Sequence, residues 1–74
     1  MLIVNDVESS TIKAIAYDED EKKLWLTFKS DAMYEYLNVE PAIVNELVDA
    51  ESKGKYFAAH IKNKPEYAYS KVEQ

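Results

Sequence analysis

The stretch LWLTFKSDAMYEYLNVEPAIVNELV, residues 24–48, decides the fold, because the spacing of its apolar residues changes near residue 40. Apolar side chains first alternate, at Leu24, Leu26 and Phe28, with the period of a half-buried strand. After Pro41, which suits the first turn of a helix, they follow helical spacing. The apolar stripe of this helix consists of Ile43, Val44, Leu47 and Val48. The sequence therefore predicts a sheet followed by helices.

The same reasoning extends outward from this stretch. Residues 11–17 and 33–37 read as two further strands, and the polar run at 18–23 reads as the turn between the first and second strands. Ser52 is a suitable N-cap for a second helix, which Lys64-Pro65 ends. We predict an α+β fold: a three-stranded antiparallel β-meander, two helices packed on one face and a short C-terminal extended segment.

This fold predicts a small core within a single domain spanning residues 1–74. The core is expected to consist of Leu24, Leu26, Phe28, Ile43, Leu47, Phe57 and Ile61. His60 lies on the apolar stripe of the second helix and is interpreted as a packing residue. A chain of 74 residues buries only about 60% of its unfolded surface, so the stability is expected to be marginal.

Composition excludes several classes of function. The chain has no cysteine and one histidine, which excludes a disulfide framework and a Cys-based zinc site. There is no Ser-His-Asp order and no phosphate-binding glycine loop, so we expect no enzyme, no cofactor and no metal. The apolar run at residues 1–4 is too short for a signal peptide or a membrane span. We expect a cytoplasmic protein.

The formal net charge is -5, and it is unevenly distributed. Residues 1–51 hold twelve acids and four lysines, whereas residues 52–74 hold two acids and five lysines. All nine cations are lysines, which act as point charges and lack the planar fork of arginine. The acidic net charge repels nucleic acid at long range, but a basic face in the second half can still contact phosphate.

A candidate anion site lies at the start of the second helix. Free N–H groups and the helix dipole attract anions there, and a glycine lets a ligand approach the backbone. The candidate contact residues are Ser52, Lys53, Gly54, Lys55 and Lys62. The alternative interpretation is a well-capped helix start, with the glycine required where two helices meet.

A candidate aromatic surface is the second site. Nucleobases stack on such surfaces without sequence readout, and neighbouring lysines can follow the phosphate backbone. The candidate residues are Trp25, Tyr34, Tyr36, Tyr67 and Tyr69. The alternative is that these rings pack internally with their hydroxyls at the rim. The two Tyr-x-Tyr pairs are expected to lie together on neighbouring strands.

The order of motifs resembles the KTSC domain, a small module found at the C-terminus of some lysyl-tRNA synthetases. The resemblance spans about residues 7–72. The motifs that carry it are Val7-Glu8-Ser9-Ser10, Ala14-Ile15-Ala16-Tyr17-Asp18, Tyr34-Glu35-Tyr36, Val39-Glu40-Pro41 and Ala50-Glu51-Ser52-Lys53-Gly54-Lys55-Tyr56-Phe57. The family usually has glycine where Ala16 stands, and often a glycine turn at residues 29–32.

The resemblance implies a free-standing bacterial or phage module that binds rather than catalyses. RNA binding has been proposed for the family because of its association with tRNA synthetases, and this gives the first hypothesis, a Lys/Tyr surface for tRNA or other structured or single-stranded RNA. The second hypothesis is a protein-interaction module that docks on a larger host protein. In that case Trp25, Tyr34 and Tyr36 would supply the anchors, and the acidic first half would face a basic partner.

Overall fold

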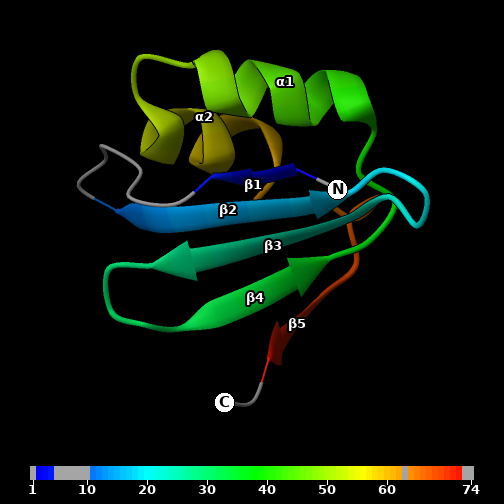
Figure 1. The fold of residues 1–74 in the computed structure, drawn as a ribbon, viewed down its shortest axis with the longest axis horizontal. Helices are drawn as coiled ribbons and strands as arrows, with labels where there is room; N and C mark the ends of the chain where they lie inside the picture. Colours follow the sequence, from blue (N-terminus) through cyan, green and yellow to red (C-terminus); the bar gives the residue numbers. More distant parts are fainter. Residues whose placement is uncertain (1, 5–10, 63, 73–74) are drawn as a thin grey trace.

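The computed structural model describes residues 2–4, 11–62 and 64–72. Within these ranges the chain forms five strands and two helices, with both helices on the same side of the sheet (Figure 1). The elements are β1 (Leu2–Val4), β2 (Ile12–Asp18), β3 (Lys23–Phe28), β4 (Met33–Tyr36), α1 (Pro41–Asp49), α2 (Lys53–His60) and β5 (Tyr69–Val72). The predicted α+β class is confirmed, and so is the β2–β3–β4 meander.

The predicted count of three strands is wrong. The sheet has the order β1-β2-β3-β4-β5, and all neighbouring pairs are antiparallel. The C-terminal segment, predicted as extended and expected beside the first Tyr-x-Tyr pair, pairs with β4 as a strand of the sheet. The N-terminal apolar run pairs with β2. Strands of three or four residues are too short to show an alternation of their own, so their structure depends on the edge that they join.

A β-bulge resolves the ambiguous pattern of β2. Two apolar sets compete in the sequence of this strand, and an odd spacing separates Ile12 from Ile15. The register between β2 and β3 shifts between Ile12 and Ala14, which places one extra residue, Lys13, in β2. Ile12, Ile15 and Tyr17 are consequently all buried on the helix side of the sheet. A regular strand would place Ile12 on the opposite face from the other two.

The helices begin as the sequence predicts, with one difference in capping. Pro41 occupies the first helical position of α1, but Glu40 at the N-cap makes no side-chain capping bond. Asn38, three residues before the helix, has φ of 61°, a left-handed conformation that asparagine tolerates. Ser52 caps α2 as predicted, because its hydroxyl accepts a hydrogen bond from the amide of Lys55.

The core lies between the sheet and the helices. Five of the predicted core residues are buried: Leu24, Leu26, Leu47, Phe57 and Ile61. Phe28 and Ile43 are only partly buried, and Val44 takes the place in α1 that was assigned to Ile43. Six further residues are buried that were not predicted to belong to the core: Ile12, Ile15, Tyr17, Tyr36, Val39 and Val44.

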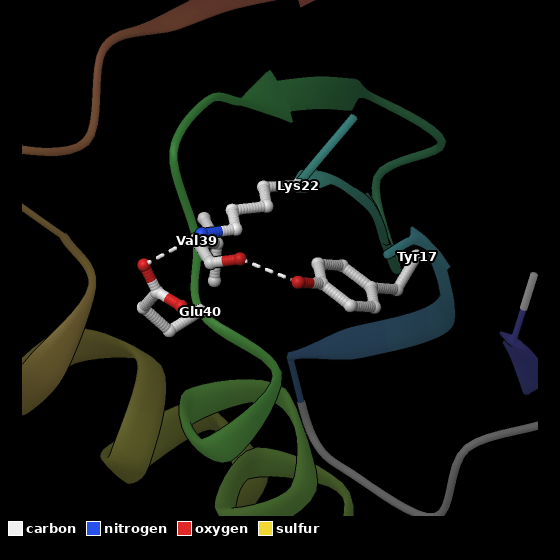
Figure 2. A network of polar contacts seen from close by, with 4 residues as sticks. All are labelled: Tyr17, Lys22, Val39 and Glu40. Atoms are coloured by element: carbon white, nitrogen blue, oxygen red, sulfur yellow. Dashed lines mark hydrogen bonds and ion pairs between the residues drawn. The ribbon is translucent and has the colours of Figure 1, made fainter. Parts of the chain in front are cut away.

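A polar contact joins the sheet to the segment that enters α1. The Tyr17 hydroxyl donates a hydrogen bond to the Val39 carbonyl at 2.6 Å, and both residues are buried. Figure 2 shows this bond beside the Lys22–Glu40 ion pair, whose atoms lie 3.0 Å apart. The ion pair is exposed and is therefore expected to add little, whereas the buried bond satisfies a carbonyl that water does not reach.

Replacing Tyr17 by phenylalanine is expected to cost about 1–3 kcal/mol, because it leaves the buried Val39 carbonyl without its donor. Tyr56→Phe is the matched control, since its hydroxyl donates to Glu46 in an exposed position. Urea unfolding of both variants measures the difference. Equal losses in the two variants would contradict the structural role of the Tyr17 bond.

Candidate functional site: an aromatic groove

A groove opens between α2 and the half of the sheet formed by β3, β4 and β5. Its volume is about 460 Å³. We call it the aromatic groove, and it is lined by Thr11, Phe28, Ser30, Ala32, Tyr34, Tyr36, Gly54, Phe57, Ala58, Lys62 and Tyr69. Strand alternation explains its aromatic floor: Tyr34 and Tyr36 pair with Leu26 and Leu24, so they share the sheet face that meets the helices.

The rings of the groove form one continuous cluster. Tyr69 stacks on Tyr36 at a centroid distance of 5.6 Å and on Tyr34 at 6.1 Å, with ring planes 27° and 4° apart. Phe57 of α2 meets Tyr36 edge-on at 5.6 Å and Phe28 at 5.5 Å. Tyr36 and Tyr69 are direct cross-strand partners. The two Tyr-x-Tyr segments are therefore adjacent, as predicted.

Tyr69 is the part of this cluster that reaches solvent. Figure 1 shows β5 at the edge of the sheet farthest from the two helices. Tyr69 is accordingly 62% exposed, whereas Tyr36, its neighbour on β4, is 4% exposed. The groove thus combines a buried, rigid aromatic base with an accessible ring at its rim, an arrangement that can receive a flat apolar group.

The charge of the groove is positive. Among the lining residues Lys62 is the one charged side chain, and it lies just beyond the C-terminal end of α2. Lys71 pairs with Tyr34 across β4 and β5, and so it lies on the same sheet face, two residues from Tyr69. Among the residues that the structure describes, the lining of the groove therefore offers aromatic faces, hydroxyls and an ammonium group but no carboxylate.

Comparison with known proteins identifies the fold and its family. The sequence-family model of the KTSC domain matches residues 8–67 of this chain. The chain belongs to the KTSC domain family. The crystal structure of a KTSC domain protein from Yersinia pestis superposes with a TM-score of 0.86 at 32% sequence identity, covering 97% of this chain and 100% of that one.

Relatives of this KTSC domain occur both alone and within larger proteins. It is 41% identical to a protein from Tsukamurella paurometabola over 76% of this chain and 84% of that protein. It is also 42% identical, over 81% of its length, to the lysine–tRNA ligase of a Nostoc species. The chain spans about a tenth of the length of that ligase, 11%.

The KTSC fold separates the predicted aromatic residues. Tyr34, Tyr36 and Tyr69 line the groove, but Trp25 does not. Trp25 alternates with the buried Leu24 and Leu26 and so lies on the outer face of the sheet, where its indole N–H donates to the Glu35 carboxylate at 2.9 Å. A single anchor face formed by Trp25, Tyr34 and Tyr36, as predicted for protein docking, is therefore wrong.

Tyr67 also lies outside the aromatic groove. It is partly buried against the core, and it follows a turn in which its amide donates to the Lys64 carbonyl. Tyr69 belongs to β5, whereas Tyr67 precedes this strand. The two members of this Tyr-x-Tyr pair thus have different environments.

The candidate anion site is divided in a similar way. Gly54 and Lys62 line the groove, whereas Ser52 and Lys55 do not. Lys55 is exposed, but the Lys53 ammonium donates to the Ala50 carbonyl at 3.1 Å and is partly buried. Lys53 therefore closes the junction between α1 and α2 and is engaged within the protein.

Gly54 does not have a positive φ, so its conformation alone does not require glycine. Glycine within a helix costs roughly 1 kcal/mol relative to alanine. Because Gly54 lines the aromatic groove, a side chain at this position would narrow it. The absence of a side chain therefore keeps the α2 wall of the groove open.

Other candidate residues have structural roles. His60 is exposed, and its ring lies tilted against that of Tyr56 at a centroid distance of 4.4 Å, so it is not buried on the apolar stripe where the sequence placed it. Asp18 stabilises the turn between β2 and β3, because its carboxylate accepts hydrogen bonds from the backbone amides of Asp20 and Glu21. No cluster of metal-ligating side chains occurs among the residues that the structure describes, and no helix there is long and apolar enough to span a membrane.

Tyr36 and Tyr56 are expected to make stability depend on pH at the alkaline end, together with Tyr17, whose pKa is also raised by burial. Burial, and then Tyr69 and Tyr34, raise the pKa of Tyr36 from 10.0 to about 12. Burial and the hydrogen bond to Glu46 raise the pKa of Tyr56 to about 12. Between pH 10 and about 12, the folded state therefore retains the phenolic protons of these residues, whereas the unfolded state loses them.

The unfolding free energy is expected to be insensitive to these two groups below pH 10 and to fall between pH 10 and about 12. Urea titrations across this range measure the fall, and the double variant Tyr36→Phe, Tyr56→Phe is expected to flatten it. An unchanged slope in the double variant would show that other groups cause the alkaline loss.

Proposed function

We propose that this KTSC domain is a non-catalytic RNA-binding module and that the aromatic groove is its RNA-contacting site. The observation that carries the proposal is the combination of stacked tyrosines with Lys62 in a groove whose described lining contains no carboxylate. Stacking of bases on aromatic side chains contributes about 1–3 kcal/mol per base, and it tolerates any sequence. This is the recognition mode that a lysine-only protein can use, because it needs no bidentate readout by arginine.

The distribution of charge supports the same surface. The groove is built partly from the second half of the chain, where lysines outnumber acids, and Lys71 extends its positive character along β5. The net charge of -5 opposes approach to RNA at long range, so affinity is expected to be modest and to fall steeply with salt. The lysine–tRNA ligases that contain a similar segment are named for action on tRNA, which is consistent with an RNA ligand.

A matched pair of variants tests the proposal. Tyr69 and Ile3 are the two large apolar residues that are strongly exposed in the described ranges, at 62% and 60%. Tyr69 lies in the groove, whereas Ile3 pairs with Ala16, a residue of the outer face in register with Trp25. Tyr69→Ala is expected to weaken binding of labelled single-stranded RNA by about tenfold, as loss of one stacking ring implies, and Ile3→Ala to leave it unchanged.

The assay is a fluorescence-anisotropy titration at about 50 mM salt, where phosphate contacts are only partly screened. Circular dichroism of both variants confirms that each remains folded. Absence of binding by the unaltered protein, or equal weakening by the two substitutions, would eliminate the groove as an RNA site.

The outer face favours protein interaction as the second candidate function. In register across the sheet it carries Ile3, Ala16, Trp25, Glu35 and Ser70. Trp25 is partly exposed beside the exposed Ile3, and tryptophan is frequent in binding hot spots. Pull-down from a nuclease-treated bacterial lysate, with Ile3→Ala and Tyr69→Ala as the two arms, distinguishes the candidates. A protein partner lost only with Ile3→Ala would favour this second function.

A further inference from the structure

We infer, on the basis of the proposed function, that the aromatic groove accepts one unpaired nucleobase of an RNA strand rather than a run of stacked bases. The elements that line the groove limit how many bases it can hold. Gly54, Phe57 and Ala58 of α2 line one side, and Ser30 and Ala32 of the β3–β4 turn also line the groove. A series of stacked bases needs a platform that continues past each ring, whereas these elements bound the aromatic floor.

The size of the groove agrees with one base. Its volume of about 460 Å³ lies near the lower end of the roughly 300–1,000 Å³ that is typical of small-molecule sites. Such a cavity suits a group of the size of one nucleotide. Tyr69, the exposed ring at the rim, offers the face on which an entering base would stack.

The polar groups fit the edges of a nucleobase. The hydroxyls of Thr11, Ser30, Tyr34 and Tyr36 belong to lining residues, and hydroxyls can both donate and accept hydrogen bonds. Base edges present donors and acceptors in combinations that differ between bases. Hydroxyls adapt to any of them, so the groove is expected to accept a base with little preference for its identity.

The lysines fit phosphates next to that base. Lys62 lines the groove beside α2, and Lys71 lies on β5 opposite Tyr34. These two ammonium groups come from different elements near the groove, which suits the phosphates that precede and follow a nucleotide in a strand. A free nucleoside monophosphate carries a single phosphate group, so a nucleotide within RNA is the ligand to which this arrangement points.

A set of labelled RNA octanucleotides tests the inference. One is fully abasic, one carries a single central uridine, one carries two adjacent uridines, and one carries uridine throughout. The single uridine is expected to raise affinity about tenfold over the abasic strand, and each further uridine to add less than about threefold. Ala58→Trp, which would fill the groove, is expected to remove the gain from the first base. Ala59→Trp, at a residue that is not among the lining residues, is expected to preserve that gain.

The outcomes separate the inference from the proposed function. Affinity that rises by a similar factor with every added uridine would overturn the one-base site but leave RNA binding intact. Failure of the all-uridine strand to bind would overturn both. Free uridine monophosphate can be added as a competitor of the single-uridine strand. If it binds the groove as tightly as that strand does, the groove holds one base but RNA is not its ligand, and the inference is overturned.

Discussion

Replacing Phe57 by alanine is expected to cost about 3–5 kcal/mol of unfolding free energy and to leave the domain largely unfolded. Phe57 is 6% exposed and is the buried residue of α2. Its ring contacts Tyr36 of β4 and Phe28 at the end of β3, so it attaches the helix to the sheet. A single core in a chain of this length rarely supplies more than about 3–5 kcal/mol, and the loss is therefore comparable to the whole.

Phe57→Leu provides the matched variant that stays folded. It preserves an apolar side chain of similar bulk and is expected to cost less than about 1.5 kcal/mol. Urea unfolding, followed by circular dichroism, compares the two substitutions. A cooperative transition of Phe57→Ala near that of the unaltered protein would contradict the packing described for α2.

Replacing Ala58 by tryptophan is expected to weaken RNA binding by at least about tenfold, at a cost in stability close to that of the same substitution at Ala59. Ala58 is exposed on α2 and lines the aromatic groove, so an indole at this position would occupy the space that a ligand needs. Ala59 is also exposed on the same helix, but it is not among the lining residues. Ala59→Trp therefore controls for helix propensity and for the addition of an aromatic ring.

The expected result is a loss of affinity of at least about tenfold for Ala58→Trp, and no more than a small change for Ala59→Trp. Because both substitutions exchange the same residue types in α2, their unfolding free energies are expected to differ by less than about 0.7 kcal/mol. Equal RNA binding by the two variants would show that the ligand does not enter the groove.

The longer elements of the fold could be predicted from sequence because their apolar spacing is unambiguous. Leu24 and Leu26 identify β3, and Val44 and Leu47 identify α1. The edge strands could not be predicted in the same way, since Leu2–Val4 and Tyr69–Val72 are ordered by partners distant in sequence. The bulge at Lys13 could not be predicted from the spacing of apolar residues either, because a bulge interrupts the two-residue period of a strand.

The candidate site was predictable only in part. Composition and motif order selected Tyr34, Tyr36 and Tyr69, and these residues do meet in one groove. Strand alternation within the sequence could have separated Trp25 from them, because Trp25 lies between two core leucines. Gly54 and Lys62 were candidates for the anion site and also line the groove. The other lining residues come from four segments, and no local pattern links them: Thr11, Phe28, Ser30, Ala32, Phe57 and Ala58.

Residues 7–10, which carry the opening motif of the KTSC resemblance, lie outside the described ranges. The match of the family model begins at residue 8 and therefore includes part of this motif. The described lining residues of the aromatic groove begin at Thr11.

Chemical-shift mapping by NMR tests whether RNA binds in the aromatic groove. The ¹⁵N-labelled domain is titrated with the single-uridine octanucleotide at about 50 mM salt, and backbone amide shifts are followed. We expect the largest shift changes at groove residues such as Tyr34, Gly54 and Tyr69, and small changes at Ala16 and Trp25 on the outer face. Largest changes on the outer face, or no saturable change at all, would contradict binding in the groove.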